Sequence, residues 1–361
     1  MKHFIFYVFL LLTIPQALLA QQEAPYLIVV TTDGLRWQEV FGGMDASLAL
    51  NKEFNQGDSA GLFKKYGQPD TSARRKALLP FIWNTVAKQG QLYGNRTHGN
   101  NVNTANKYWF SYPGYNEIFT GYPDTLVNSN DYPPNPNVTV LEYLNQQPQF
   151  TGKIAAFTAW EAFNRILNEK RSGIPVTAAF DTITGKQLRP EQHLLNQLLL
   201  QSYKPWDEAE CLDVFTHAAA MDYLKSARPK VLYISYGETD EWAHAGQYRD
   251  YLNAAHQVDA WLQEIWTFVQ TTPPYKNNTN LLITVDHGRG RGRAWTSHGE
   301  GVTGADEIWF AVIGPGIKAK GDVMGSLQLY QQQLAQTMAG LLGVTYKAAH
   351  PVAEGLLPLL K

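Results

Sequence analysis

Carboxylate and imidazole side chains that could bind a metal ion follow several apolar segments of this chain. The set consists of Asp33, Asp240, His244, Asp286, His287 and His298. Mixed carboxylate and imidazole ligands favour zinc over manganese or iron. The set is larger than one catalytic zinc needs, because such an ion keeps about three protein ligands and an open position. We therefore expect two divalent metal ions, which together can stabilise the attacking and leaving oxygens of an in-line displacement.

Each of these residues also has a structural explanation when it is taken alone. Asp33 at the end of an apolar run is ordinary turn chemistry. Asp240 and His244 lie one helical turn apart and share a helix face, which is common for surface pairs. Glu238 and Glu241 flank Asp240, so the choice of the carboxylate that binds metal stays open at this point.

Ser111 is the candidate nucleophile. It lies just before Pro113, a residue favoured in the first turn of a helix, and helix-compatible residues continue to Thr120. A helix N-terminus favours an anion, and metal coordination favours the alkoxide form of a hydroxyl. The structural alternative is that Ser111 only caps the helix, the commonest role of such a serine.

Strands alternate with helices along the chain. Runs rich in Val, Ile, Leu and Tyr predict strands at Tyr26–Thr32, Lys153–Thr158, Lys230–Tyr236, Asn280–Val285 and Glu307–Ile313. Apolar residues at helical spacing predict helices at Leu79–Lys88, Asp207–Ser226, Tyr248–Val269 and Leu327–Leu342. This alternation predicts an α/β fold, a three-layer sandwich with a largely parallel central sheet flanked by helices. Ligands of such sheets bind at the carboxyl ends of the strands, which is where Asp33, Asp240 and Asp286 follow them.

Two stretches depart from this alternation. Leu48–Arg75 is polar and predicts a surface loop. Trp160–Trp206 mixes aromatic residues, proline and charge, and it predicts a small cap inserted into a catalytic domain that spans residues 21–361.

Residues 1–20 combine a basic start, an apolar run and small residues before Gln21. This pattern is typical of a secretory signal peptide. We therefore expect export to the periplasm or the cell exterior. After signal cleavage we expect no membrane segment, because no later apolar run reaches the roughly 20 residues that a spanning helix needs.

Composition argues against nucleic acid as a partner and is compatible with a small-molecule substrate. The formal net charge is −2 and no basic stripe is present, so nucleic acid is not an expected partner. Cys211 is the single cysteine, and its apolar surroundings favour a core residue over a nucleophile. The expected partner is a small-molecule substrate.

Taken in order, these motifs resemble the alkaline phosphatase superfamily, in particular its nucleotide pyrophosphatase/phosphodiesterase branch. The resemblance rests on Asp33, Ser111-Tyr112-Pro113, Thr120-Gly121-Tyr122-Pro123, Asp240 with His244, Asp286-His287-Gly288 and His298-Gly299. It implies a secreted phosphoric ester hydrolase with one zinc on Asp240, His244 and His298. A second zinc would lie on Asp33, Asp286 and His287, with Ser111 bridging toward phosphorus and forming a phosphoseryl intermediate. An Asn would donate to a phosphoryl oxygen; Asn130 is favoured for it and Asn128 stays open.

The chain also departs from the family pattern. Ser111 stands where Thr is usual, and Gly114 where Asn is usual. The predicted cap is short. No Lys or Arg is firmly placed to bind the third oxygen of a phosphate monoester, and Arg289–Arg293 is interpreted as a solvated loop. Phosphodiesterase and phosphomonoesterase activities therefore both stay open.

The sequence disfavours three other functions. A sulfatase of the same superfamily needs an Arg where Tyr115 stands. A phosphoglycerate mutase needs a second large inserted domain and a cytoplasmic location. A binding protein that only retains the fold would be expected to lack ligands, whereas the whole set and a nucleophile are present.

Overall fold

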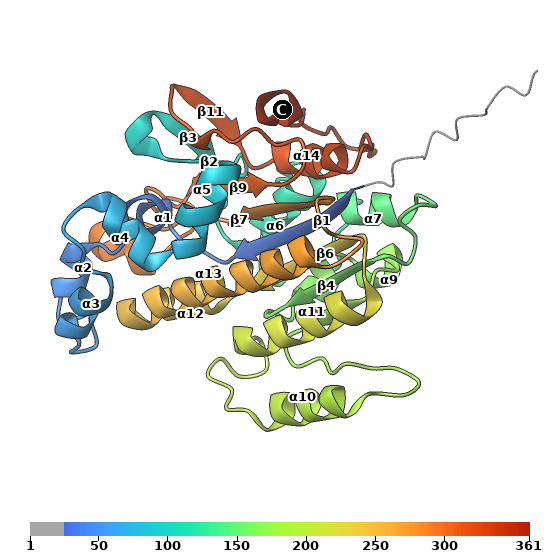
Figure 1. Ribbon diagram of the computed structural model, residues 1–361, viewed down its shortest axis with the longest axis horizontal. Helices are drawn as coiled ribbons and strands as arrows, with labels where there is room; N and C mark the ends of the chain where they lie inside the picture. The colour runs from blue at the N-terminus through green and yellow to red at the C-terminus, as the bar shows by residue number, and fades with distance from the viewer. Residues whose placement is uncertain (1–24) are drawn as a thin grey trace, which may run out of the picture.

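The computed structural model describes residues 25–361, and the predicted signal peptide lies outside the described residues. The centre of the molecule is an 8-stranded sheet (Figure 1). Its strands, in spatial order, are β10 (Gly321–Asp322), β2 (Gln91–Tyr93), β9 (Phe310–Ile313), β7 (Thr279–Thr284), β1 (Tyr26–Thr32), β6 (Val231–Tyr236), β4 (Ile154–Thr158) and β5 (Val176–Ala178). A 3-stranded sheet contains β11 (Leu327–Tyr330), β3 (Asn100–Asn103) and β8 (Glu307–Ile308).

Most of the large sheet is parallel, as predicted. β7, β1, β6, β4 and β5 run in one direction, whereas β9 is antiparallel to both β7 and β2. The strands β1, β6 and β7 are buried along their whole length. That burial on both faces explains why they read as continuous apolar runs rather than as alternating patterns.

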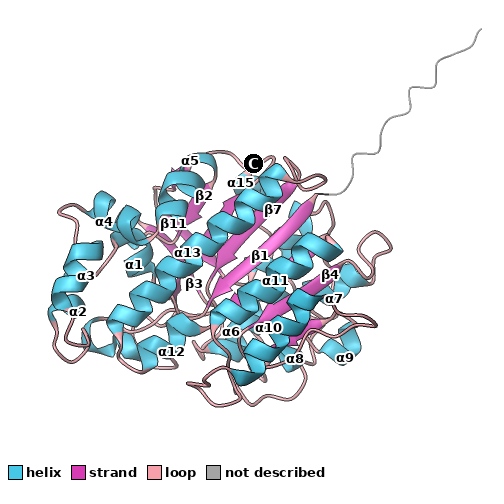
Figure 2. Ribbon diagram, turned by 60° about the horizontal axis from the view of Figure 1, so that its bottom comes forward, coloured by secondary structure: helices cyan, strands magenta, loops and turns pink. Residues whose placement is uncertain are grey.

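Helices cover both faces of the sheet (Figures 1 and 2). α11 (Asp213–Ala227) and α13 (Tyr248–Thr271) lie on one face, and α6 (Ser111–Thr120), α7 (Val140–Asn145) and α14 (Gln333–Leu341) lie on the other. α13 buries one stripe that includes Leu252, Val258 and Leu262, the arrangement expected of an amphipathic helix. The predicted three-layer α/β sandwich is confirmed.

The remaining helical segments are short, apart from α10 with 12 residues. They are α1 (Trp37–Gly42), α2 (Ala46–Leu50), α3 (Ser59–Tyr66), α4 (Thr71–Leu78), the π-helix Ile82–Val86, α5 (Ala87–Gln89), the 3₁₀ turns Arg96–His98 and Gly292–Thr296, α8 (Phe163–Ile166), α9 (Glu169–Ser172), α10 (Pro190–Gln201), α12 (Glu238–His244) and α15 (Leu357–Leu360). In residues 25–361 no helix combines the length and the apolar character needed to cross a membrane.

The prediction of a surface loop at Leu48–Arg75 is wrong, because this stretch contains most of three short helices. Asp45, Asp58 and Asp70 cap α2, α3 and α4, and each accepts a backbone N–H of its helix. Such side-chain caps satisfy donors that a helix start leaves unpaired, so even polar segments with few apolar residues form helices there.

Two predicted helices begin later than expected. Leu327–Tyr330 forms β11, which pairs with β3, so the helix in Leu327–Leu342 starts only at Gln333. The helix in Asp207–Ser226 starts at Asp213, because Glu210 instead bridges to Trp160 and Trp206. In both cases a partner that is distant in sequence decides the local structure.

The segment predicted as a cap, residues 160–206, forms α8, α9, β5 and α10. β5 pairs with β4 and extends the central sheet as its last strand. The covering role of the rest of this segment stays a prediction.

Candidate metal centre

Three neighbouring parallel strands bring the predicted ligands to one edge of the sheet. Asp33 follows β1, Asp286 follows β7, and Asp240 lies in α12, which begins just after β6. β7, β1 and β6 are adjacent and parallel, with Thr31 of β1 in register with both neighbours. Their carboxyl ends therefore meet, and residues that are far apart in the sequence become neighbours.

His287 lies at the middle of this cluster. Its Nε2 is 3.3 Å from Asp33 Oδ1, 3.3 Å from Asp286 Oδ2 and 3.8 Å from Asp240 Oδ1. The ring of His298 stacks on that of His287, with 3.8 Å between centroids. The imidazole of His287 is thus enclosed by three carboxylates and a second imidazole.

His244 lies at the outer side of the cluster. Its Nε2 is 3.0 Å from Asp240 Oδ2 and 2.9 Å from His298 Nε2. Its side chain is 45% exposed, whereas that of His287 is fully buried. All predicted ligands are therefore brought together, with His244 next to solvent.

Two groups of ligand atoms are close enough to surround an ion. One consists of Asp33, Asp286 and His287, and the other of Asp240, His287 and His298; within each group the ligand atoms lie within 4.8 Å of one another. The first group matches the set implied by the resemblance. In the second, His287 takes the place expected for His244.

The buried carboxylates fit a cation. Asp33 Oδ1 and Asp286 Oδ2 are buried and have no hydrogen-bond donor in the described part of the chain. Burial, and next the charge of Asp240, raises the pKa of Asp33 well above its ordinary value. Burial, and next the charge of Asp33, raises the pKa of Asp286 in the same way. A buried carboxylate oxygen without a donor is costly, and a divalent cation bound between these two oxygens would remove that cost.

On the side of the centre that contains Asp240 and His298, the pKa values are lowered instead of raised. Burial alone would raise the pKa of Asp240, but the Arg289 guanidinium and then His298 lower this pKa well below its ordinary value. Burial, and next His287, lowers the pKa of His298 well below its ordinary value. A neutral imidazole is the form that binds a metal, so His298 is suited to this role.

Ser111 is the first residue of α6, and Phe110, whose side chain makes no capping hydrogen bond, occupies the N-cap position. The Ser111 hydroxyl is largely buried and its Oγ lies 3.4 Å from His287 Nε2. The structural alternative, in which Ser111 caps the helix, is therefore wrong. Its hydroxyl instead faces the residue shared by the two ligand groups.

The two candidate asparagines lie in different surroundings. Asn130 Oδ1 accepts the backbone N–H of Tyr112, which follows Ser111. Asn128 is exposed, and no hydrogen bond of its side chain is found within residues 25–361. Of the two, Asn130 lies beside the helix that begins at Ser111.

Two further residues hold the ligands and were not anticipated. Tyr115 donates its hydroxyl to Asp33 Oδ2 at 2.8 Å, one helical turn after Ser111. Arg289 is buried, contacts Asp240 Oδ1 through Nη1 and donates to the carbonyls of Trp295 and Thr296. The interpretation of Arg289–Arg293 as a solvated loop is therefore wrong for Arg289, because this guanidinium neutralises a buried carboxylate. The sequence feature that indicates a role for Arg289 in the centre is its position directly after Asp286-His287-Gly288.

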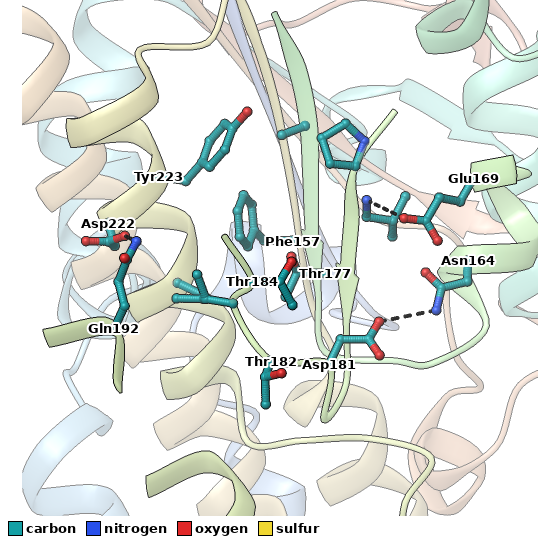
Figure 3. Close-up of a pocket in the computed structure, with 15 residues that line it drawn as sticks. Phe157, Asn164, Glu169, Thr177, Asp181, Thr182, Thr184, Gln192, Asp222 and Tyr223 are labelled. Carbon is teal, nitrogen blue, oxygen red and sulfur yellow. Dashed lines mark hydrogen bonds between the residues drawn. The ribbon is translucent and has the colours of Figure 1, made fainter. Parts of the chain in front are cut away.

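A cavity of about 480 Å³ lies beside the edge strand β5, apart from the predicted ligands (Figure 3). Its carboxylates already have donors: Glu169 accepts the N–H of Val176, and Asp181 accepts that of Ala178. These acidic side chains thus satisfy the outer backbone groups of the last strand, which would otherwise remain unpaired.

Comparison with known proteins identifies the family and the fold of the chain. The family described as type I phosphodiesterase / nucleotide pyrophosphatase matches residues 40–297, a span that includes Ser111 but neither Asp33 nor His298. No curated protein matches the chain.

Several solved structures share the fold. A 2-O GAG sulfatase has a TM-score of 0.61 at 15% identity, over 94% of this chain and 74% of its own. The alkaline phosphatase PafA has a TM-score of 0.57 at 11% identity, over 92% and 98% of the two chains. A protein in the alkaline phosphatase superfamily from Vibrio parahaemolyticus has a TM-score of 0.51 at 12% identity, over 91% and 68%. The chain has an alkaline phosphatase-like fold and belongs to the type I phosphodiesterase / nucleotide pyrophosphatase family.

Proposed function

We propose that this chain hydrolyses phosphate esters with divalent metal ions and with Ser111 as the nucleophile. The observation that carries the proposal is the position of the Ser111 hydroxyl, 3.4 Å from His287, where the two groups of metal-binding side chains meet. A nucleophile beside two cation sites is the arrangement that in-line phosphoryl transfer needs.

The residues divide into two sites. Asp33, Asp286 and His287 would hold one ion, and Asp240 and His298 with the adjacent His244 would hold the other. Zinc suits this set of carboxylates and imidazoles. Such ions, when bound, polarise the phosphoryl oxygens and stabilise developing negative charge on the attacking and leaving oxygens.

The side chains of this chain supply the nucleophile and its orientation. Ser111 Oγ forms a bond to phosphorus while the bond from phosphorus to the alcohol oxygen breaks, and the alcohol leaves with a proton. Water then cleaves the phosphoseryl bond. The Oδ1 of Asn130 is held by Tyr112 N, which leaves its Nδ2 to donate to a phosphoryl oxygen. The N-terminus of α6 favours the same anion.

We propose phosphodiesters rather than monoesters as the preferred class. A monoester dianion has a third charged oxygen, and an additional cationic side chain would stabilise it. Arg289 is the cation in direct contact with the predicted ligands, and its donors already bind Asp240, Trp295 and Thr296. A sulfatase is disfavoured, since Tyr115 stands where Arg is needed and its hydroxyl donates to Asp33.

The pattern of residues 1–20 supports the further proposal that the protein is exported to the periplasm or the cell exterior.

Parallel rate measurements test the proposed function. Zinc-loaded protein should hydrolyse bis-nitrophenyl phosphate at least about tenfold faster than nitrophenyl phosphate, since a tenfold rate difference needs only about 1.4 kcal/mol of transition-state binding. It should not hydrolyse nitrophenyl sulfate at a comparable rate. Removal of metal by a chelator should abolish the activity, and zinc should restore it. A protein that binds less than one metal ion and stays inactive with zinc would instead be a binding module.

Loss of the Tyr115 hydroxyl should weaken the first metal site. In Tyr115→Phe, Asp33 Oδ2 loses its donor, and loss of such a supporting hydrogen bond costs about 10–100-fold in metal affinity or activity. Zinc affinity from competition with a chromogenic chelator measures the effect. Tyr93→Phe is the control, because the Tyr93 hydroxyl is also buried but donates to Gln91, away from the centre. Equal zinc affinities for both variants would contradict a supporting role for Tyr115.

A further inference from the structure

An acidic, tryptophan-rich rim lies next to the metal centre on the β4 and β6 side. We define it as Glu210, Glu241, Trp160, Trp206 and Trp242. Glu210 forms β-bridges with Trp160, which follows β4, and with Trp206. Cys211 N donates to Ala159 O, which fixes this segment at the end of β4. The rim therefore lies at the carboxyl edge of the sheet, on the same side as the predicted ligands.

Glu210 is the most unusual residue of the rim. It is only 7% exposed, and its Oε1 is buried with no hydrogen-bond partner in residues 25–361. The carboxyl group lies against the backbone of Gly237, where a Cβ would be 1.6 Å from Oε1. Gly237 directly follows β6, and the N–H of Asp240 donates to its carbonyl. Glu210 is thus a near neighbour of the turn that carries a predicted metal ligand.

The charges that act most strongly on Glu210 are those of other acids. Burial, followed by the charges of Glu241 and Asp213, raises the pKa of Glu210 well above its ordinary value, and Asp33 and Asp240 add to this. A buried carboxyl group without donors among other acids is unfavourable, and a cation bound nearby would stabilise it.

Not all acids near Glu210 are available to a ligand. Asp213 accepts the N–H groups of Gly237 and Glu238, and Glu238 in turn accepts from Asp213 N and from the indole of Trp242. These two carboxylates hold the turn into α12. No hydrogen bond or ion pair of Glu241 is found in the part of the chain that the structure describes, although His244 and Arg289 are close enough for their charges to act on it. Glu241 is therefore the second acid of the rim whose oxygens are not held by a donor.

Tryptophan rings complete the rim. The rings of Trp206 and Trp242 meet edge to face, with 5.1 Å between centroids. Trp242 belongs to α12, the helix that also carries Asp240 and His244. Indole faces attract cations, and an ammonium group between aromatic rings and carboxylates is bound by both. A doubly charged metal ion would instead need several oxygen ligands directed at one point.

We propose that this rim is a subsite for the organic group of the phosphate ester, and that this group carries an ammonium nitrogen. The inference rests on the proposed phosphodiesterase function, because the rim adjoins the centre at which the ester would react. Glu210 and Glu241 would bind the positive charge, and Trp160, Trp206 and Trp242 would enclose the alkyl groups attached to the nitrogen.

A pair of substrates that differ only in charge tests the subsite. Nitrophenyl phosphocholine carries a trimethylammonium group, and in its uncharged isostere a tert-butyl group replaces it; both release the same nitrophenol. For the zinc-loaded full chain, kcat/KM should be at least about tenfold higher for the charged substrate, the scale expected of a desolvated cation–π contact with added charge. Glu210→Gln and Trp206→Leu should each lower this ratio at least threefold.

The control is Glu208→Gln. Glu208 is an acid of the same segment, but its side chain is exposed and pairs with Lys204. This variant should leave the ratio unchanged. Circular dichroism and Tm verify that Glu210→Gln folds, and Trp206→Leu tests the rim independently of that residue.

The outcomes separate the two proposals. Equal kcat/KM for both substrates in the wild-type protein, or hydrolysis of bis-nitrophenyl phosphate without hydrolysis of either, would overturn the ammonium subsite and leave the phosphodiesterase intact. No hydrolysis of any of the three diesters would overturn the proposed function itself. A third equivalent of bound zinc or magnesium that Glu210→Gln loses would also overturn the subsite, because the rim would then bind a metal ion.

Discussion

Replacement of Ser111 by alanine is expected to lower kcat for a nitrophenyl phosphodiester by at least about 10⁴-fold, the scale on which loss of a nucleophile acts in hydrolases with a covalent intermediate. The expectation follows from geometry. Ser111 Oγ lies at the start of α6 and 3.4 Å from His287 Nε2, so it is the hydroxyl found next to both groups of ligands. Without it no phosphoseryl intermediate can form.

The Ser111→Ala protein should keep its metal. The two groups of carboxylates and imidazoles do not include Ser111, so zinc content should stay close to that of the wild-type protein. Ser111→Thr should restore activity to within about tenfold, because the hydroxyl nucleophile is retained. Ser129→Ala serves as the control, since the Ser129 hydroxyl only accepts the N–H of Asp131. Substantial activity of Ser111→Ala would mean that water, not Ser111, attacks phosphorus.

Replacement of His287 by alanine is expected to reduce both metal content and turnover more than replacement of His244. His287 belongs to both ligand groups and is fully buried, whereas His244 is next to solvent and contacts only the Asp240 side. We expect a loss of more than about 10³-fold for His287→Ala and of about 10–100-fold for His244→Ala, because the first opens both coordination spheres.

Metal analysis together with kcat/KM measures this order. His217→Ala is the matched control: His217 is also buried, but it contacts Tyr236 and Glu264 away from the centre, so its loss should leave zinc content unchanged. Zinc content that falls equally in His244→Ala and His287→Ala would contradict the shared role of His287.

Much of the fold follows from local patterns. The five strands expected from apolar runs are present within a residue or two, although Glu307–Ile313 divides at Trp309 so that β8 and β9 join different sheets. The helices α2, α3 and α4 were missed even though their capping residues Asp45, Asp58 and Asp70 are visible in the sequence. The polar composition of this segment predicts a loop, whereas the caps are the stronger local signal and predict helices.

The residue types of the centre could be read from the chain because Asp33 and Asp286-His287 follow apolar runs directly, and strands of a parallel sheet end at a common edge. The residues that contact them could not be predicted from the sequence. Arg289 beside Asp240, Tyr115 beside Asp33 and Glu210 above Gly237 depend on which strands and helices become adjacent.

The local chemistry of the chain was therefore enough to predict an α/β sandwich, a set of metal-binding side chains and a serine at the start of a helix. Only the folded molecule decided that β7, β1 and β6 lie side by side, that His287 belongs to both ligand groups, and that Asn130 rather than Asn128 lies next to Ser111. The reason is physical: strand and helix formation depends on residues close in sequence, whereas pairing and burial depend on contacts between segments far apart in it.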